Sequence, residues 1–356
     1  MSTMKRMRGF SMVSLMVGLF VGMLVVLAVH GSASFFETNR RQMIAGNAAF
    51  ENAMGGLLAI QRAARQAGLA LSLDGRLACA SVNIHRNGTT IADGVVIPPV
   101  RIGNGGDDSD SVTLAFASSI QAAMPAQSIR PMDASDDEIL VGSAIGLNAG
   151  DLVMVGLPGA GTPCTLMQVG AIAASAAPAG MRVSLAGVTT WNPADRSAAF
   201  TTMPSYPTGA LVQRVGNWNW LTYRVANGRL EEVDNIGGTV NVMADDVVYL
   251  KAAYGATNGA DRTIEQWALP VGGWENPSTV QLDAVRAVHL GVVARNPQRV
   301  KPSVAGGACD ATTEATITLW PFGPTVDLSR LGADWGCYRY RVLTLAVPLR
   351  NVIFGD

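Results

Sequence analysis

The chain has 356 residues, of which 49% are hydrophobic and 15% are charged, and its formal net charge is -1 at pH 7. This length and apolar content are enough to bury the core of one or two domains. The near-zero net charge argues against a broad basic surface for nucleic acid, so we expect no nucleic-acid partner. All 17 prolines and most of the 39 glycines lie beyond about residue 70, where they form short turn signals, and this pattern predicts a β-rich body.

The first predicted element is the uncharged run FSMVSLMVGLFVGMLVVLAV at residues 10–29. A helix rises 1.5 Å per residue, so a run of this length can cross the apolar core of a bilayer. Lys5, Arg6 and Arg8 precede the run. The positive-inside rule therefore places the first residues in the cytoplasm and exports the chain beyond His30.

Two processing sites compete at this N-terminus. The small residues Ser32, Ala33 and Ser34 suit an ordinary signal peptidase, which would leave a mature chain that begins at Phe35. The alternative is a cut before Phe10, which keeps the apolar run on the mature protein. The first mature residue distinguishes the two sites.

A second helical signal follows the apolar run. Residues 34–67 contain no proline, and Phe36, Met43, Phe50 and Leu57 recur every seven residues. This spacing places the four side chains on one face of an amphipathic helix. The two signals are continuous in the chain, so they predict one long helix.

We expect this helix to span residues 10–68, with a transmembrane part at 10–29 and an amphipathic part at 30–68 that packs on the globular body. Its length would be on the order of 85 Å. Gly68 is a suitable residue to end it. The remaining chain, 69–356, is expected to form a β-rich head.

Several short runs bounded by Gly, Asp or Pro predict strands in the head. They are SVTLAFA (111–117), DLVMVG (151–156), RVSLAGV (182–188), DAVRAVHLGVVAR (283–295) and YRYRVLTLAVPLRN (338–351). Pro348 has no N–H to donate, so the last strand should end near it or lie at a sheet edge. The fold class is therefore α+β, an antiparallel β head behind one long helix. We expect an inserted β subdomain at about 95–215.

The four cysteines are widely spaced, and none forms a Cys-x-x-Cys pair: Cys79, Cys164, Cys309 and Cys337. Spacing alone does not fix their connectivity. Cys309 and Cys337 bracket a segment broken by glycine and proline, where a bridge would restrict the unfolded chain. We therefore predict that pair and, by default, Cys79 with Cys164. Four free thiols would follow instead if the chain stayed in the cytoplasm.

Signatures of an enzyme are missing from the sequence. The three histidines are His30, His85 and His289. No two of them have the spacing of a metal site or a nucleophile–base pair. GLPGAGT at 156–162 lacks the Lys-Ser/Thr of a phosphate-binding loop. We therefore expect no catalytic activity and no cofactor.

Two polar or aromatic groupings leave alternatives open. The acidic clusters are Asp107, Asp108 and Asp110, and Asp245 with Asp246. They are either solvated loops or surface calcium sites, although GNGGDDSDS at 103–111 lacks the spacing of an EF-hand. Trp218 and Trp220 flank Asn219 and either fill the core and its rim or form an adhesive surface.

The N-terminal stretch MRGFSMVSLMVGLF at 7–20 resembles the class III signal of type IV pilins and pseudopilins, in which Gly9 and Phe10 match the cleavage pair. Three further stretches resemble the PilW family of minor pilins. They are DSDSVTLAFA (108–117), DDVVYLKAAYGATNGADR (245–262) and YRYRVLTLAVPLRNVIF (338–354). The last, with its Val-Pro-Leu-Arg-Asn motif, is the most specific.

The resemblance implies a non-enzymatic subunit that helps to initiate and cap a type IV pilus. Prepilin peptidase would remove the leader, residues 1–9, and methylate Phe10, and the retained helix would pack in the filament core. The implied partners are other minor pilins and the major pilin, with a tip adhesin as a further candidate. The implied location is the inner membrane with a periplasmic head, and after assembly the pilus tip at the cell surface.

Ser14 departs from the usual pattern of this family, because the fifth mature residue is normally a glutamate that meets the N-terminal ammonium of an earlier-added subunit. An unpaired carboxylate in hydrocarbon is costly. Loss of the glutamate therefore suits a subunit at or near the filament tip. Simple divergence is the alternative.

Two other functions share part of this evidence. A pseudopilin of a type II secretion system would have the same leader and helix, and the Val-Pro-Leu-Arg-Asn motif favours the pilus over it. A membrane-anchored or secreted β-rich binding protein could carry a pilin-like leader by coincidence.

Overall fold

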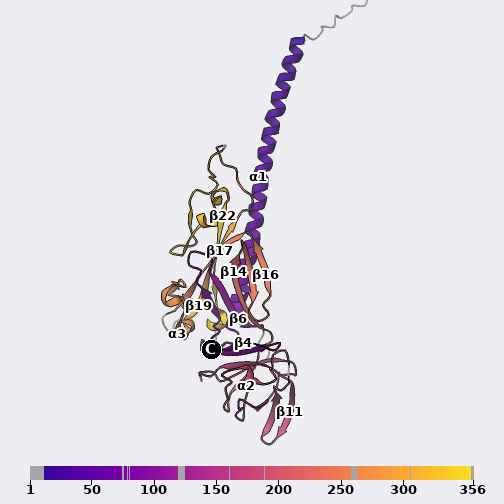
Figure 1. Ribbon diagram of the computed structural model, residues 1–356, viewed down its shortest axis with the longest axis vertical. Helices are drawn as coiled ribbons and strands as arrows, with labels where there is room; N and C mark the ends of the chain where they lie inside the picture. The colour runs from indigo at the N-terminus through magenta and orange to yellow at the C-terminus, as the bar shows by residue number, and fades with distance from the viewer. Residues whose placement is uncertain are drawn as a thin grey trace, which may run out of the picture.

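The computed structural model describes residues 12–73, 76–77, 79, 81–118, 125–159, 161–187, 189–257, 263–304 and 306–353. One long helix, α1 (Met12–Gln66), projects from a β-rich body that has two lobes stacked along the long axis (Figure 1). Its 55 residues correspond to about 83 Å. The α+β class predicted from the sequence is therefore observed, whereas Gly9 and Phe10 lie outside the described residues.

The lobe nearer the free end of α1, here the proximal body, contains two antiparallel sheets. The first has the order β16-β15-β14-β6-β5, with β5 (Val100–Gly103), β6 (Ser111–Ala117), β14 (Trp218–Ala226), β15 (Arg229–Asp234) and β16 (Val240–Asp245). The second has the order β18-β17-β19-β22, with β17 (Val247–Ala256), β18 (Gln266–Ala268), β19 (Val285–Arg295) and β22 (Tyr340–Pro348). As predicted, β22 is an edge strand and ends at Pro348.

The lobe farther from the free end of α1, here the distal lobe, also contains two sheets (Figure 1). The larger has the order β4-β3-β10-β9-β13-β7, with β3 (Val82–Arg86), β4 (Thr89–Val95), β7 (Ala126–Gln127), β9 (Leu152–Gly156), β10 (Cys164–Gln168) and β13 (Leu211–Arg214). The smaller has the order β11-β12-β8, with β8 (Glu138–Val141), β11 (Ala171–Ala176) and β12 (Ala179–Ser184). The pairing of β3 with β10 is parallel, an exception to the antiparallel arrangement.

The limits of the distal lobe differ from the expected subdomain at about 95–215. Strands β3 and β4 belong to the distal lobe, although they precede residue 95 apart from the last residue of β4. Strands β5 and β6 lie inside the expected limits but pair in the proximal sheet, where β6 is adjacent to β14. The chain therefore enters the distal lobe twice. The sequence patterns of strands identify the strands but not the strands they pair with. The second entry into the distal lobe was therefore not predictable from these patterns.

The remaining elements are short. Two hairpins are β1–β2 (Ser72–Leu73, Arg76–Leu77) and β20–β21 (Thr316–Thr318, Thr325–Asp327). The short helices are α2 (Arg196–Ala199), α3 (Thr279–Asp283), α4 (Arg350–Ile353) and the 3-10 turns η1 (Gly272–Trp274), η2 (Leu328–Leu331) and η3 (Trp335–Cys337).

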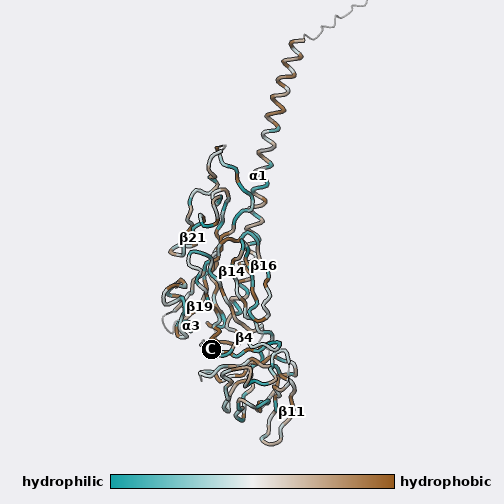
Figure 2. Tube along the Cα trace, viewed as in Figure 1, coloured by the Kyte–Doolittle hydropathy of each residue, from teal (hydrophilic) through white to brown (hydrophobic). Residues whose placement is uncertain are grey.

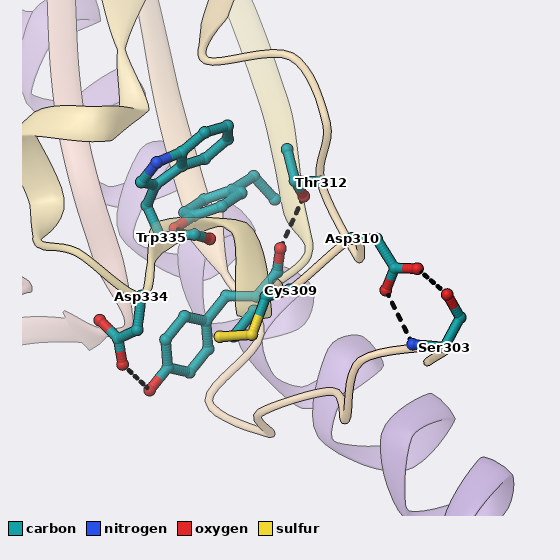
Figure 3. Close-up of a disulfide and its surroundings, with 9 residues drawn as sticks. Ser303, Cys309, Asp310, Thr312, Asp334 and Trp335 are labelled. Carbon is teal, nitrogen blue, oxygen red and sulfur yellow. Dashed lines mark hydrogen bonds between the residues drawn. A yellow bond between two sulfur atoms is a disulfide. The ribbon is translucent and has the colours of Figure 1, made fainter. Parts of the chain in front are cut away.

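The cysteines are paired as Cys79–Cys164 and Cys309–Cys337, with Cα–Cα distances of 5.6 and 4.7 Å. These are the pairs that the sequence favours. The second bridge closes the excursion between β19 and β22 (Figure 3). Beside it, the Thr312 hydroxyl donates to the carbonyl of Tyr338 at 2.6 Å, and Ser303 donates to the Asp310 carboxylate. Covalent and polar links thus hold an excursion that contains little regular structure.

Removal of the Cys309–Cys337 bridge tests its contribution. The two residues are 28 positions apart, so chain entropy predicts a loss of about 3 to 4 kcal/mol in the free energy of unfolding for the double serine variant. Urea unfolding of the full chain in detergent measures this loss. Peptide mapping of native protein without reductant should recover the bridged pair, and recovery of both thiols free would contradict the pairing.

Candidate assembly surface

The N-terminal half of α1, from Met12 to Arg41, extends beyond the body and is defined here as the free segment (Figures 1 and 2). Its described side chains are all exposed, and residues 12–36 contain no Asp, Glu, Lys or Arg. The first ion pair occurs outside this apolar stretch, between Arg41 and Glu37 at 2.9 Å. The helix is long and apolar enough to cross a membrane. A continuous apolar surface of this kind requires lipid or protein to cover it.

Ser14 lies on the free segment, between the exposed side chains of Val13 and Leu15. Nothing from the described part of the head reaches this depth of the helix, because packing on the body begins near Gln42. The environment of Ser14 is therefore supplied by lipid or by another chain.

The C-terminal half of α1, defined here as the docked segment (residues 42–66), packs on the proximal body. Its buried residues recur every three or four positions and so occupy one face. They are Ala49, Ala53, Gly56, Leu57, Ile60, Ala63 and Ala64. The segment contacts β6 and β16 of one sheet and β19 and β22 of the other. Both proximal sheets thus rest against one helix.

The seven-residue stripe predicted from the sequence only partly coincides with this face. Leu57 is buried and Phe50 is half-buried, whereas Phe36 and Met43 are 72% and 70% exposed. The period was correct from Phe50 onward, but it continues toward the N-terminus into turns whose apolar side chains the body leaves exposed. Periodicity shows which face is apolar and not where the covering sheet ends.

Small residues let the helix approach the sheets closely. A Cβ atom added to Gly56 would lie 2.7 Å from Leu230 Cδ2 and 3.3 Å from Ala244 Cβ. At the first turn of the docked segment, Asn296 Nδ2 donates to the Gln42 carbonyl at 3.0 Å. The docked segment is therefore held by close apolar packing along its length and by a hydrogen bond at its start.

The Val-Pro-Leu-Arg-Asn motif caps the C-terminus of α1. After β22, Asn351 Nδ2 donates to the Gln66 carbonyl at 2.9 Å and lies 3.4 Å from the Ala67 carbonyl. The helix ends at Gln66, and Gly68 in the turn that follows has a φ of +86° and donates its N–H to the Ala115 carbonyl at 3.0 Å. Helix ends leave carbonyl groups without intrahelical partners, and Asn351 supplies a donor to one of them, that of Gln66. Sequence reasoning missed this role, because the helix and the asparagine are far apart in the chain.

A cleft of about 340 Å³ lies where α1 leaves the body. The docked segment contributes Met43 and Phe50 to the lining, and Arg341 in β22 and Arg339 just before it contribute the facing side. The guanidinium carbon of Arg341 lies 5.6 Å from the Phe50 ring centre. Both arginines are exposed. The cleft therefore offers a mainly apolar floor with cationic side chains, next to the free segment.

The acidic clusters face cationic side chains of the same chain. The Asp110 carboxylate is buried, 3.0 Å from the Lys251 ammonium, and accepts a hydrogen bond from the N–H of Ala252. Arg330 lies within 3.4 Å of both Asp107 and Asp108. In the second cluster, Asp245 is 2.9 Å from Arg229, and burial raises the pKa of Asp246. The described residues contain no group of three or more His, Cys, Asp or Glu side chains placed to hold a metal.

The two histidines of the head lie in packed surroundings. Burial lowers the pKa of both His85 and His289, which favours the neutral imidazole. His289 stacks on Trp320 with ring centres 4.2 Å apart. The ring of Trp267 is tilted against His289, and these two ring centres are 5.0 Å apart. Trp218 is buried and Trp220 is half-buried. These positions are typical of a core and its rim.

Comparison with known proteins gives no relative: no family model, no curated protein and no solved structure matches this chain.

Paired glycine variants test the docked segment. Gly56 is buried against Leu230, so Gly56→Leu should lower the free energy of unfolding by about 1–3 kcal/mol through overpacking. Gly55 is exposed, and an added Cβ would meet nothing within 4 Å. Gly55→Leu should therefore leave stability unchanged or raise it by up to about 1 kcal/mol. The midpoints of urea unfolding of the two full-length variants measure this difference in stability. Equal midpoints would contradict close packing at Gly56.

Proposed function

We propose that this chain is a minor pilin of the PilW type, a non-enzymatic subunit that helps to initiate and cap a type IV pilus at or near its tip. The observation that carries the proposal is the division of α1 into an apolar free segment and a docked segment with an alanine- and glycine-rich face. A retained helix of this kind serves as a membrane anchor before assembly. It then serves as the surface by which subunits pack in a filament.

The geometry of the free segment supports assembly over simple anchoring. The transmembrane run continues into the docked segment as one helix, so a pull on the head is transmitted directly to the segment in the membrane. The cleft lined by Phe50 and Arg341 lies beside the point of exit, where the helix of a neighbouring subunit would pass. A secreted binding protein would need neither feature. A secretion pseudopilin would share both, and the Val-Pro-Leu-Arg-Asn motif supports the pilus instead.

The processing site is the first test of this proposal. We expect the mature chain to begin at Phe10 with an N-methyl group, because prepilin peptidase would cut after Gly9. N-terminal sequencing and mass spectrometry of protein from membranes measure this. A mature chain that begins at Phe35 would remove the pilus proposal. As a paired check, a bulky residue at Gly9 should leave unprocessed protein in the inner membrane.

Position in the filament is tested at Ser14. A subunit that enters first has no earlier ammonium to pair with, so Ser14→Glu would place an unpaired carboxylate in lipid. We therefore expect no increase in the minor pilins that co-purify with this variant. Met16→Glu, on a different side of the free segment, is the matched control for a carboxylate at similar depth.

An increase in co-purified minor pilins with Ser14→Glu would indicate a different position in the filament. If the subunit sits below another minor pilin, the new carboxylate would pair with that neighbour's charged N-terminus in a low-dielectric environment. More complex would then be recovered with Ser14→Glu than with either wild type or Met16→Glu. That result would exclude the first position in the tip and leave the pilin proposal in place.

A further inference from the structure

A polar cleft of about 580 Å³ lies at the junction of the two lobes, away from the free segment of α1. Its walls come from strand ends in both lobes: Arg86 and Gln168 from the distal lobe, and Trp218 and Asp234 from the proximal body. The volume is within the range of small-molecule sites, about 300–1,000 Å³. The assembly surface does not use this cleft, so it requires a separate explanation.

The charges that line the cleft are balanced within the protein. Arg214 lies 2.9 Å from the Asp151 carboxylate, and Arg86 lies 3.8 Å from Asp234. A strongly anionic or cationic ligand would have to compete with one of these pairs. A neutral ligand with many hydroxyl groups can instead donate to the carboxylates and accept from the guanidinium groups.

The cleft also has an aromatic wall. The half-buried Trp191 lines it, and the guanidinium carbon of Arg86 lies 5.4 Å from the centre of the indole ring. An indole offers a flat apolar surface together with a polar N–H. The apolar C–H face of a sugar ring can stack on such a surface. A phosphate or another small anion has no apolar face to do so.

Two donors in the lining have no acceptor among the described residues, the indole N–H of Trp218 and the Nε–H of Arg86. Trp218 is only 5% exposed, and a buried donor without a partner is costly. Both nitrogen atoms are out of contact with solvent, so a ligand in the cleft would reach them only after a side-chain shift.

The lining is held in place before any ligand arrives. Asn192 Oδ1 accepts from the Gln168 N–H at 2.8 Å, and Asn192 Nδ2 donates to the Gln168 carbonyl at 2.7 Å. The Gln168 amide then donates to the Gly150 carbonyl at 3.1 Å. Side chains that are already ordered lose little entropy on binding.

From these observations we propose that the cleft between the lobes binds a neutral oligosaccharide, with a sugar ring stacked on Trp191 and hydroxyl groups bonded to the carboxylates of Asp151 and Asp234. The site goes beyond the assembly function, and its test does not depend on filament formation.

The test uses the full chain in a detergent without a sugar headgroup. The probes are maltotetraose, cellotetraose and N-acetylchitotetraose as neutral sugars, and a heparin tetrasaccharide as the acidic comparison. We expect calorimetric binding of at least one neutral sugar and weakening by about tenfold in Trp191→Ala, which loses the stacking surface. Trp267→Ala removes a 40% exposed tryptophan elsewhere on the head and should leave the affinity unchanged.

A measurement on the unmodified chain guards against misfolding of the variant. The bound neutral sugar should protect Trp191, and not Trp267, from oxidative footprinting. Failure of all three neutral sugars to bind overturns the proposal, as does binding of the heparin tetrasaccharide alone. Neutral-sugar binding that neither depends on Trp191 nor protects it also overturns the proposal.

Discussion

The contact between the docked segment of α1 and both proximal sheets is the constraint on which the rest of the molecule depends. One apolar core contains Leu57 and Ile60 of the helix, Leu114 and Leu230 of the first sheet, and Leu290 of the second. The helix can lie this close because Gly56 and several alanines leave room for the sheet side chains. Since α1 is continuous, the same contact fixes the direction in which the free segment leaves the body.

A buried ion pair complements this apolar packing. The ammonium of Lys251 in β17 is held by the Asp110 carboxylate and by the Gly106 carbonyl at 2.7 Å. The pair joins the start of β6 in one sheet to the middle of β17 in the other. Because desolvation offsets much of the attraction in such pairs, its contribution is better described as fixing the relation of the two sheets than as adding stability.

The two lobes are joined by a second core rather than by flexible linkers alone. It contains the Cys79–Cys164 pair, Ile84 and Leu166 of the distal lobe, and Trp218 of the proximal body. The strand ends around this core cannot pair with each other across the junction, so their polar side chains line a cleft beside it. The polar cleft is thus a geometric consequence of stacking two sheets end to end.

The sequence by itself determined the features that depend on neighbours in the chain. The uncharged run and the seven-residue period predicted one long helix, turn residues bounded strands such as β6, β9 and β19, and the lack of an N–H in proline placed Pro348 at the end of an edge strand. These signals are local, because helix and strand periods are set by the backbone. Of the candidate assembly surface, the apolar run and Ser14 were identifiable from local sequence alone.

Only the tertiary structure decided which distant segments meet. It paired β6 with β14 and β5 with β6 in the proximal body, brought Asn351 to the end of α1, and left Phe36 and Met43 exposed. It also gave the acidic clusters their arginine and lysine partners and placed Trp191 in the polar cleft. Pairing and burial of this kind depend on the summed packing of residues far apart in the chain. Helix and strand periods in the sequence therefore do not predict that packing.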